Sequence, residues 1–206
     1  MEENLIINIG RQYGSGGREI GKRIAEKLGL AFYDKELINL ASKESGLGKE
    51  FFEQADEKTR FSFFGNFLGI SSVSADDYTY NYLTNENLFL IQSDVIKEIA
   101  SKQPALFVGR CADYILRGNP KCINIFISAD MDDRIIRVCN RKTIEHDKAA
   151  EMIEKRDKKR AEYYNFYTNK TWGAAKSYHL CINSSLLGIE RTVEYIARFI
   201  GEQLSQ

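Results

Sequence analysis

The sequence predicts an α/β protein in which a five-stranded parallel sheet is flanked by helices. Short apolar segments alternate along the chain with longer segments of helical period, which is typical of a parallel sheet covered on both faces. Glycine and charged residues follow several of the apolar segments, at the strand ends where such sheets bind ligands. The expected strands are residues 5–9, 30–34, 105–109, 123–128 and 178–183.

Helices are expected between these strands because apolar residues recur at intervals of three or four. Ile20, Ile24 and Leu28 share one face of the first helix, and Gly29 is a typical helix stop. The later helices are expected at 35–46, 85–101, 131 to about 164, and 188–204, the last with Ile189, Val193, Ile196 and Ile200 facing inward.

The composition and charge of the chain argue against several classes of partner and ligand. The 206 residues include 29 basic and 29 acidic ones, and a formal net charge of zero argues against a nucleic acid as the main partner. No apolar run approaches the ~20 residues that span a membrane, and the N-terminus lacks a signal-peptide pattern. The four cysteines form no CxxC pair, so we expect reduced thiols and no zinc site in a cytoplasmic protein.

Residues 47–85 differ from the rest because they are rich in aromatic residues and glycine and follow no clean period. We expect an insert, helical in part, within a single domain that spans residues 1–206. The stretch "FSFFGNFLGI" is more typical of a core or a self-association surface than of a cofactor pocket, and such a surface would allow a homodimer.

The segment "GRQYGSGGREIG" at residues 10–21 follows the first strand and has the features of a phosphate-binding loop. Such a loop needs glycines with positive φ, so that N–H groups point inward, and a helix N-terminus that attracts anions. The segment supplies both, and the candidate phosphate ligands are Gly14, Ser15, Gly16, Gly17, Arg18 and Glu19.

The loop departs from the standard pattern G-x-x-x-x-G-K-[ST]. Aligned on the helix, Gly17 stands at the lysine position, and Glu19 stands two residues after it, next to the position of the Ser/Thr that normally holds Mg²⁺. Arg18 could reach a β- or γ-phosphate in place of the lysine. Glu19 could bind Mg²⁺ or stabilise the helix N-terminus, and Ser15 offers a second oxygen.

Two other interpretations of the loop stay open. A dinucleotide-binding G-x-G-x-x-G loop would use Gly14 and Gly16 with Asp34 as the distal acid, but Glu19 stands where the third glycine belongs. The segment could also be an ordinary turn between a strand and a helix.

Arginines elsewhere could supply further positive charge. Arg110 follows a buried strand, where it could clamp a phosphate or pair with Asp113 or Asp34. Between residues 131 and 164 most charges are expected on a solvated helix surface. Two sets there could close over a triphosphate as a lid that excludes water: Arg134, Arg137 and Arg141, and Arg156 with Arg160.

Six blocks of the chain occur in the same order in a known family. They are "GRQYGSGGREIGKRIAEKLGLAFYDKELI", "NENLFLIQSDVIKEIA", "ALFVGRCADYIL", "INIFISADMDDRIIRV", "EKRDKKRAEYY" and "INSSLLGIERTVEYI". Together they resemble the cytidylate kinase-like family, a branch of the P-loop nucleoside monophosphate kinases. The resemblance implies that fold with an acceptor-binding insert at residues 35–95, a lid at about 131–170, and ATP and Mg²⁺ as ligands.

The resemblance also implies roles for single residues. Residues 15–19 would hold the phosphates of ATP, and Asp34 would contact the acceptor nucleotide. Arg110 matches the arginine of the family's "DGRD" block, near the acceptor phosphate, and Arg156 with Asp157 matches the Arg-Asp of the lid. The catalytic candidates are Arg18, Arg110, Arg156 and Arg160.

The chain departs from cytidylate kinases at the missing loop lysine and at Val108 and Cys111, which replace the two acids of "DGRD". We therefore expect an ATP-dependent phosphotransferase that acts on a small acceptor. The leading candidate for this acceptor is a pyrimidine nucleoside monophosphate, CMP or dCMP. The alternative is a nucleotide-binding regulatory protein of the same fold without kinase turnover. An NAD-type enzyme is disfavoured by Glu19.

Overall fold

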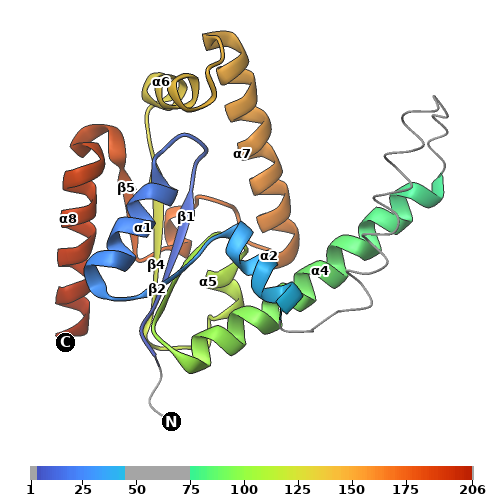
Figure 1. Cartoon of the computed structure of the whole chain (residues 1–206), viewed down its shortest axis with the longest axis horizontal. Helices are drawn as coiled ribbons and strands as arrows, with labels where there is room; N and C mark the ends of the chain where they lie inside the picture. The colour runs from blue at the N-terminus through green and yellow to red at the C-terminus, as the bar shows by residue number, and fades with distance from the viewer. Residues whose placement is uncertain (1–3, 45–74, 206) are drawn as a thin grey trace. The chain divides into compact units, whose positions relative to one another are not determined.

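The computed structural model describes residues 4–44 and 75–205, with side chains at 4–41 and 86–205. Its five strands are all parallel and form one sheet in the order β2-β3-β1-β4-β5 (Figure 1). This sheet confirms the predicted fold class. The strands are β1 (Ile6–Arg11), β2 (Ala31–Tyr33), β3 (Ala105–Val108), β4 (Cys122–Ser128) and β5 (Leu180–Asn183).

Helices follow the strands in the predicted alternation. They are α1 (Gly17–Leu28), α2 (Lys35–Glu44), α4 (Ala75–Lys102), α5 (Ala112–Ile115), α6 (Met131–Lys142), α7 (His146–Thr168) and α8 (Ser184–Leu204), with a short 3-10 helix at Ala175–Ser177. Helix α1 ends as predicted, because Gly29 adopts a φ of 65° and its N–H bonds to Ala25 O. Within residues 4–44 and 75–205, no helix is both long enough and apolar enough to cross a bilayer.

The chain forms two compact units, of which one comprises Met1–Lys35 with Ile99–Gln206 and the other Glu36–Glu98. The first unit contains the whole sheet. In the second, Gln92 Nε2 donates a hydrogen bond to Asn39 Oδ1 (2.6 Å), which joins α4 to α2.

Helix α4 begins at Ala75, well before the predicted start at residue 85. The prediction missed this part of the helix because the sequence between these points has no clean helical period. Most of the aromatic segment lies in residues 45–74, outside the described residues. Its part in a homodimer, and the acceptor-binding role of residues 35–95, therefore stay predictions.

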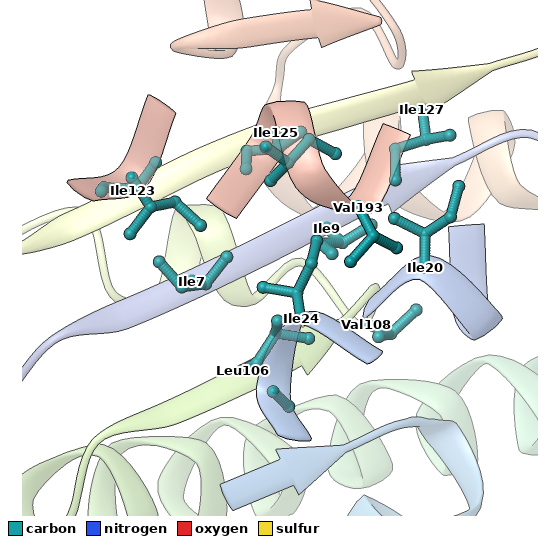
Figure 2. Packing of buried hydrophobic residues seen from close by; sticks show 13 residues of the cluster. Ile7, Ile9, Ile20, Ile24, Leu106, Val108, Ile123, Ile125, Ile127 and Val193 are labelled. Carbon is teal, nitrogen blue, oxygen red and sulfur yellow. The ribbon is translucent and has the colours of Figure 1, made fainter. Parts of the chain in front are cut away.

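The main core lies between the sheet and helices α1 and α8. Side chains of a strand alternate between its two faces, so Ile7 and Ile9 of β1 point to the same face. Ile20 and Ile24 of α1 and Val193 of α8 pack against them (Figure 2). The core continues through Leu106, Val108, Ile123, Ile125, Ile127, Ile196 and Ile200, which confirms the predicted inward faces of α1 and α8.

The region predicted as helical from residue 131 to about 164 consists of two helices, α6 and α7. Thr143 ends α6 with a left-handed φ of 54°, and its N–H bonds to Cys139 O (2.8 Å). Helix α7 then packs back against α6. The charged pattern of the sequence does not mark this turn, because the contacts that stabilise it form only between the two helices: Ile135, Val138, Ala149 and Ile153.

Replacing Ile125 with alanine tests the core. Ile125 is fully buried in β4, so its truncation should lower the free energy of unfolding by about 2–5 kcal/mol. Ile136→Ala on α6 is the control, because Ile136 is 56% exposed and its loss should cost less than about 0.5 kcal/mol. Urea unfolding measures both variants, and equal losses would contradict the assigned core.

Candidate functional site

The glycine loop, residues 12–16, joins β1 to α1 and takes its shape from its glycines. Gly14 (φ 83°) and Gly16 (φ 77°) lie in the left-handed region, which glycine adopts without steric cost. Neighbouring atoms also leave no room for a side chain at these two positions. A Cβ at Gly14 would lie 2.9 Å from Arg134 O, and one at Gly16 would collide with Ile189 of α8. The backbone can follow this path only with glycine at both positions.

Helix α1 begins at Gly17 and presents its N-terminus to the loop. The cap residue is Gly16, which has no side chain, and the Ser15 hydroxyl accepts from the N–H of Gly17. The helix dipole and the N–H groups of the first turn favour a bound anion here. The predicted arrangement of a glycine turn followed by a helix N-terminus is therefore present.

The two predicted Mg²⁺ ligands lie in different surroundings. Ser15 is fully buried, and its hydroxyl donates to Gln12 O (2.9 Å) and accepts from the Gly17 N–H (3.3 Å). Glu19 is exposed and pairs with Arg23 (2.8 Å) in the next turn. In the described ranges no three His, Cys, Asp or Glu side chains converge as a metal site. Both residues stay predicted ligands, and Glu19 is the accessible one.

The helix pair α6–α7 is clamped onto the glycine loop by Arg134 and Asp157. Arg134 Nε donates to Tyr13 O (2.8 Å), and Asp157 Oδ1 accepts from the Tyr13 N–H (2.7 Å). Arg134 and Asp157 also form an ion pair, with only 6% and 15% of their side chains exposed. Burial raises the pKa of Asp157, while the Tyr13 N–H and the guanidinium group oppose the rise. We call Tyr13, Arg134 and Asp157 the loop clamp.

Two further arginines bind backbone carbonyl groups, one at the end of β1 and one in the loop. Arg160 Nη1 donates to Arg11 O (2.9 Å), and Arg137 Nη1 donates to Gly14 O (3.4 Å). Ser184, at the start of α8, donates its hydroxyl to Ser15 O (2.7 Å) from another side. The carbonyl groups of Tyr13, Gly14 and Ser15 are thus bonded to side chains from α6 and α8.

Guanidinium groups also surround the ring of Tyr13. Arg141, Arg156 and Arg160 lie 5.0, 6.0 and 5.4 Å from the ring centroid, within the range of cation–π contacts. Arg141 and Arg156 are exposed. Among the described residues, Asp157 is the only acid that pairs with an arginine of α6 or α7, so an excess of positive charge lies beside the loop.

Arg18 and Asp34, both predicted site residues, are paired with each other. Arg18 Nε donates to Asp34 Oδ2 (2.7 Å), and its Nη2 lies 2.6 Å from the same oxygen. Asp34 is 2% exposed and follows β2, which β3 separates from β1. The guanidinium of Arg18 is therefore engaged away from the glycine loop, and the predicted contacts of both residues with phosphate and acceptor stay predictions.

The turn after β3 carries Arg110 on an unusual backbone. Gly109, Arg110 and Cys111 have φ values of 81°, 60° and 56°, which non-glycine residues adopt rarely and often at functional sites. The Arg110 guanidinium lies 5.1 Å from the ring centroid of Tyr163 on α7. Val108 and Cys111, which stand where cytidylate kinases carry acids, are both buried. Burial raises the pKa of Cys111 to about 12, so its thiol is protonated at neutral pH.

A buried carboxyl group that sequence reasoning did not select lies next to this turn. The hydroxyl of Tyr164 on α7 donates to Asp113 Oδ2 on α5 (2.7 Å). Burial raises the pKa of Asp113, while the hydrogen bond from Tyr164 and the charge of Lys170 oppose the rise. No local pattern marks this pair, because its partners are 51 positions apart in the chain.

The glycine loop and the α6–α7 arginines together suit an extended anion such as a polyphosphate. Arg156 and Arg160 lie at the loop, whereas Arg110 lies at the end of β3 and Arg18 is paired with Asp34. Positive charge placed in advance beside a bound phosphate is the main requirement for catalysis of phosphoryl transfer.

Replacing Asp157 with asparagine tests the loop clamp. The change leaves the buried Arg134 charge without its carboxylate, which should lower the free energy of unfolding by about 3–5 kcal/mol. Glu154→Gln, an exposed position on the same helix, is the control and should cost less than about 0.5 kcal/mol. Urea unfolding distinguishes them, and a loss no larger than in the control would show that the clamp does not stabilise the protein.

Replacing Asp113 with asparagine tests the buried carboxyl group. Because the folded pKa of Asp113 lies above its ordinary value of 3.8, the folded state binds its proton more tightly, and wild-type stability gains from this group as pH falls. The amide carries no charge, so Asp113→Asn should be at least as stable as wild type at pH 8. This advantage should shrink below the folded pKa and vanish near pH 3.8.

Thermal unfolding between pH 4 and pH 8 measures the effect of Asp113→Asn. Asp94→Asn, at an exposed position of α4, is the matched control and should show no such trend. A stability difference that grows as pH falls would contradict the raised pKa of Asp113.

Comparison with known proteins agrees with this arrangement. A solved structure of an uncharacterized protein from Eubacterium ventriosum is similar with a TM-score of 0.75 and 27% identity, covering 97% of this chain and 99% of that one. Shikimate kinase from Bacteroides thetaiotaomicron is similar in fold, with a TM-score of 0.53 and 15% identity over 98% of this chain and 99% of that one. No curated protein matches the sequence.

The model of the cytidylate kinase-like family matches residues 6–186. The match includes β1, the glycine loop, the turn after β3, helices α6 and α7, and the start of α8. The resemblance seen in the sequence is thereby confirmed, and the protein belongs to the cytidylate kinase-like family.

Proposed function

We propose that the protein is an ATP-dependent phosphotransferase that moves the γ-phosphoryl group of ATP to a pyrimidine nucleoside monophosphate, CMP or dCMP. The family and the kinase fold support phosphoryl transfer. The observation that carries the proposal is the glycine loop at the N-terminus of α1, where packing excludes a Cβ at Gly14 and Gly16. The choice of acceptor rests on the family description.

The residues present fit a nucleotide polyphosphate with Mg²⁺. The loop offers N–H groups and a helix N-terminus, and the exposed Arg141 and Arg156 offer charge that no described acid neutralises. Mg²⁺ in kinases is bound mostly by phosphate oxygens and water, with one or two protein oxygens, and Glu19 is the accessible oxygen ligand of α1. When bound, Mg²⁺ would neutralise part of the phosphate charge.

The chain contributes positioning and charge to the transfer. An oxygen of the acceptor phosphate attacks the γ-phosphorus while the bond to the β–γ bridging oxygen breaks, so ADP leaves and no covalent intermediate on the protein is needed. Arg156 and Arg160 would stabilise the negative charge of the transferred group. Arg110, held against the ring of Tyr163, would bind the acceptor phosphate.

A second candidate function is nucleotide binding without turnover. It is favoured by Val108 and Cys111, which are buried apolar groups where cytidylate kinases carry acids. Without these carboxylates, Mg²⁺ or the acceptor would lose one set of ligands. A protein of this kind would bind ATP through the same loop but would release no ADP in response to an acceptor.

ADP release from Mg-ATP tests the proposed kinase activity, with CMP, dCMP, UMP, AMP, GMP and shikimate as acceptors. We expect turnover with CMP or dCMP. Arg156→Ala should lower kcat on the order of 10³-fold if Arg156 contacts the transferred group, without loss of stability, because its side chain is exposed. Lys155→Ala, the neighbouring exposed cation, is the control. Tight ATP binding without acceptor-dependent ADP release would instead support the regulatory alternative.

A further inference from the structure

We propose that Arg11 supplies the positive charge that a lysine supplies in a standard P-loop. The inference rests on the proposed function, because it assigns a residue to the same polyphosphate site. In the standard pattern the lysine stands at the position of Gly17, which has no side chain. A cation that takes the place of this lysine would therefore come from another position of the chain.

The direction of the Arg11 side chain follows from the alternation of β1. Ile7 and Ile9 belong to the core beneath α1 and α8. Arg11 is the last residue of β1, two positions after Ile9, so its side chain leaves the strand on this same face. It therefore emerges at the carboxyl end of β1, where α1 begins.

The stem of Arg11 takes the space in which a lysine side chain at Gly17 would begin. A Cβ at Gly17 would lie 2.6 Å from Arg11 Cβ and 3.0 Å from Arg11 Cγ. Real Cβ atoms do not approach other atoms so closely, so a side chain at position 17 and the side chain of Arg11 exclude each other. A lysine at position 17 would therefore require that the side chain of Arg11 move or be absent.

The stem of Arg11 passes Gly17 at the first turn of α1, and its guanidinium lies at Gly109, directly after β3. A Cβ at Gly109 would lie 3.0 Å from Arg11 Cζ and 3.3 Å from Nη2, with Nη1 nearer still. Gly109 directly follows β3 and bonds through its N–H to Ile9 O (3.1 Å), so it is the neighbour of β1 at this edge. The stem of Arg11 thus runs along the helix end that would bind a phosphate, and its charge lies at the neighbouring strand end.

Arg18, the residue that the sequence suggests for this role, is placed differently. Its head pairs with Asp34 after β2, on the far side of β3 from the loop. Arg11 instead precedes the loop directly, its backbone carbonyl accepts a hydrogen bond from Arg160 (2.9 Å), and its stem lies against Gly17. A guanidinium there can donate two hydrogen bonds to one phosphate, which a lysine cannot do with the same geometry.

Calorimetric titration with ATP and with inorganic tripolyphosphate, in the presence of Mg²⁺, tests this inference. Arg11→Ala should weaken binding of both ligands by about 10- to 100-fold, the effect of losing one charged hydrogen-bonding group. Arg11→Lys should retain more affinity than Arg11→Ala because it keeps the charge. Arg198→Ala, on the exposed surface of α8, is the matched control and should leave affinity unchanged.

A double variant moves the cation to its standard place. Arg11→Gly removes the stem that blocks position 17, and Gly17→Lys then restores the pattern G-K, so the pair should bind more tightly than Arg11→Gly alone. Thermal unfolding checks that each variant is folded. If the double variant does not fold, the comparison of lysine, alanine and glycine at position 11 decides the question.

The outcomes separate this inference from the proposed function. Wild-type affinity in Arg11→Ala, or a loss confined to Arg18→Ala, overturns the role of Arg11 while ATP binding by the wild type still stands. Tripolyphosphate binding that depends on Arg11, without binding of ATP, supports the role of Arg11 and refutes the kinase. Failure of the wild type to bind either ligand refutes both.

Discussion

The buried ion pair between Arg134 and Asp157 holds the glycine loop, and the rest of the site depends on it. A loop rich in glycine loses much conformational entropy on ordering, so contacts from elsewhere must hold it. Here both backbone groups of Tyr13 bond to this pair. Either charge alone would be costly to bury, so the loop is ordered only when α6 and α7 are packed together and supply both.

The arginines of α6 and α7 divide into two groups. Arg134 and Arg137 bind carbonyl oxygens of the loop, and Arg160 binds that of Arg11 directly before it. Arg141 and Arg156 instead lie near the ring of Tyr13 with exposed side chains. Carbonyl oxygens near a bound phosphate would repel it, so covering them with guanidinium groups both builds the loop and makes its surroundings positive. Movement of the whole α6–α7 pair would break these bonds together and would also release the loop.

The site carries more arginine and less acid than the standard kinase pattern. The loop lysine is absent, and Val108 and Cys111 are buried apolar groups at the end of β3. The same edge of the sheet holds Arg11 against Gly109 and Arg110 against Tyr163. Guanidinium groups are charged at neutral pH and can bind oxygen pairs, so this edge of the sheet carries positive charge although the loop lysine is missing.

The sequence by itself determined the parallel sheet, the inward faces of α1 and α8, and the glycine loop at the first strand end. These features follow from local patterns, since the period of apolar residues reports burial and a glycine turn before a helix reports an anion site. The partners of the charged side chains were decided only by the tertiary structure. Arg18 pairs with Asp34. Asp157 and Arg134 bond to Tyr13, which is 144 and 121 positions away in the chain. The side chain of Arg11 lies against Gly17 and Gly109. The physical reason is that an arginine has several carboxylates and carbonyls within reach of its long side chain, and only the packing of distant elements selects among them.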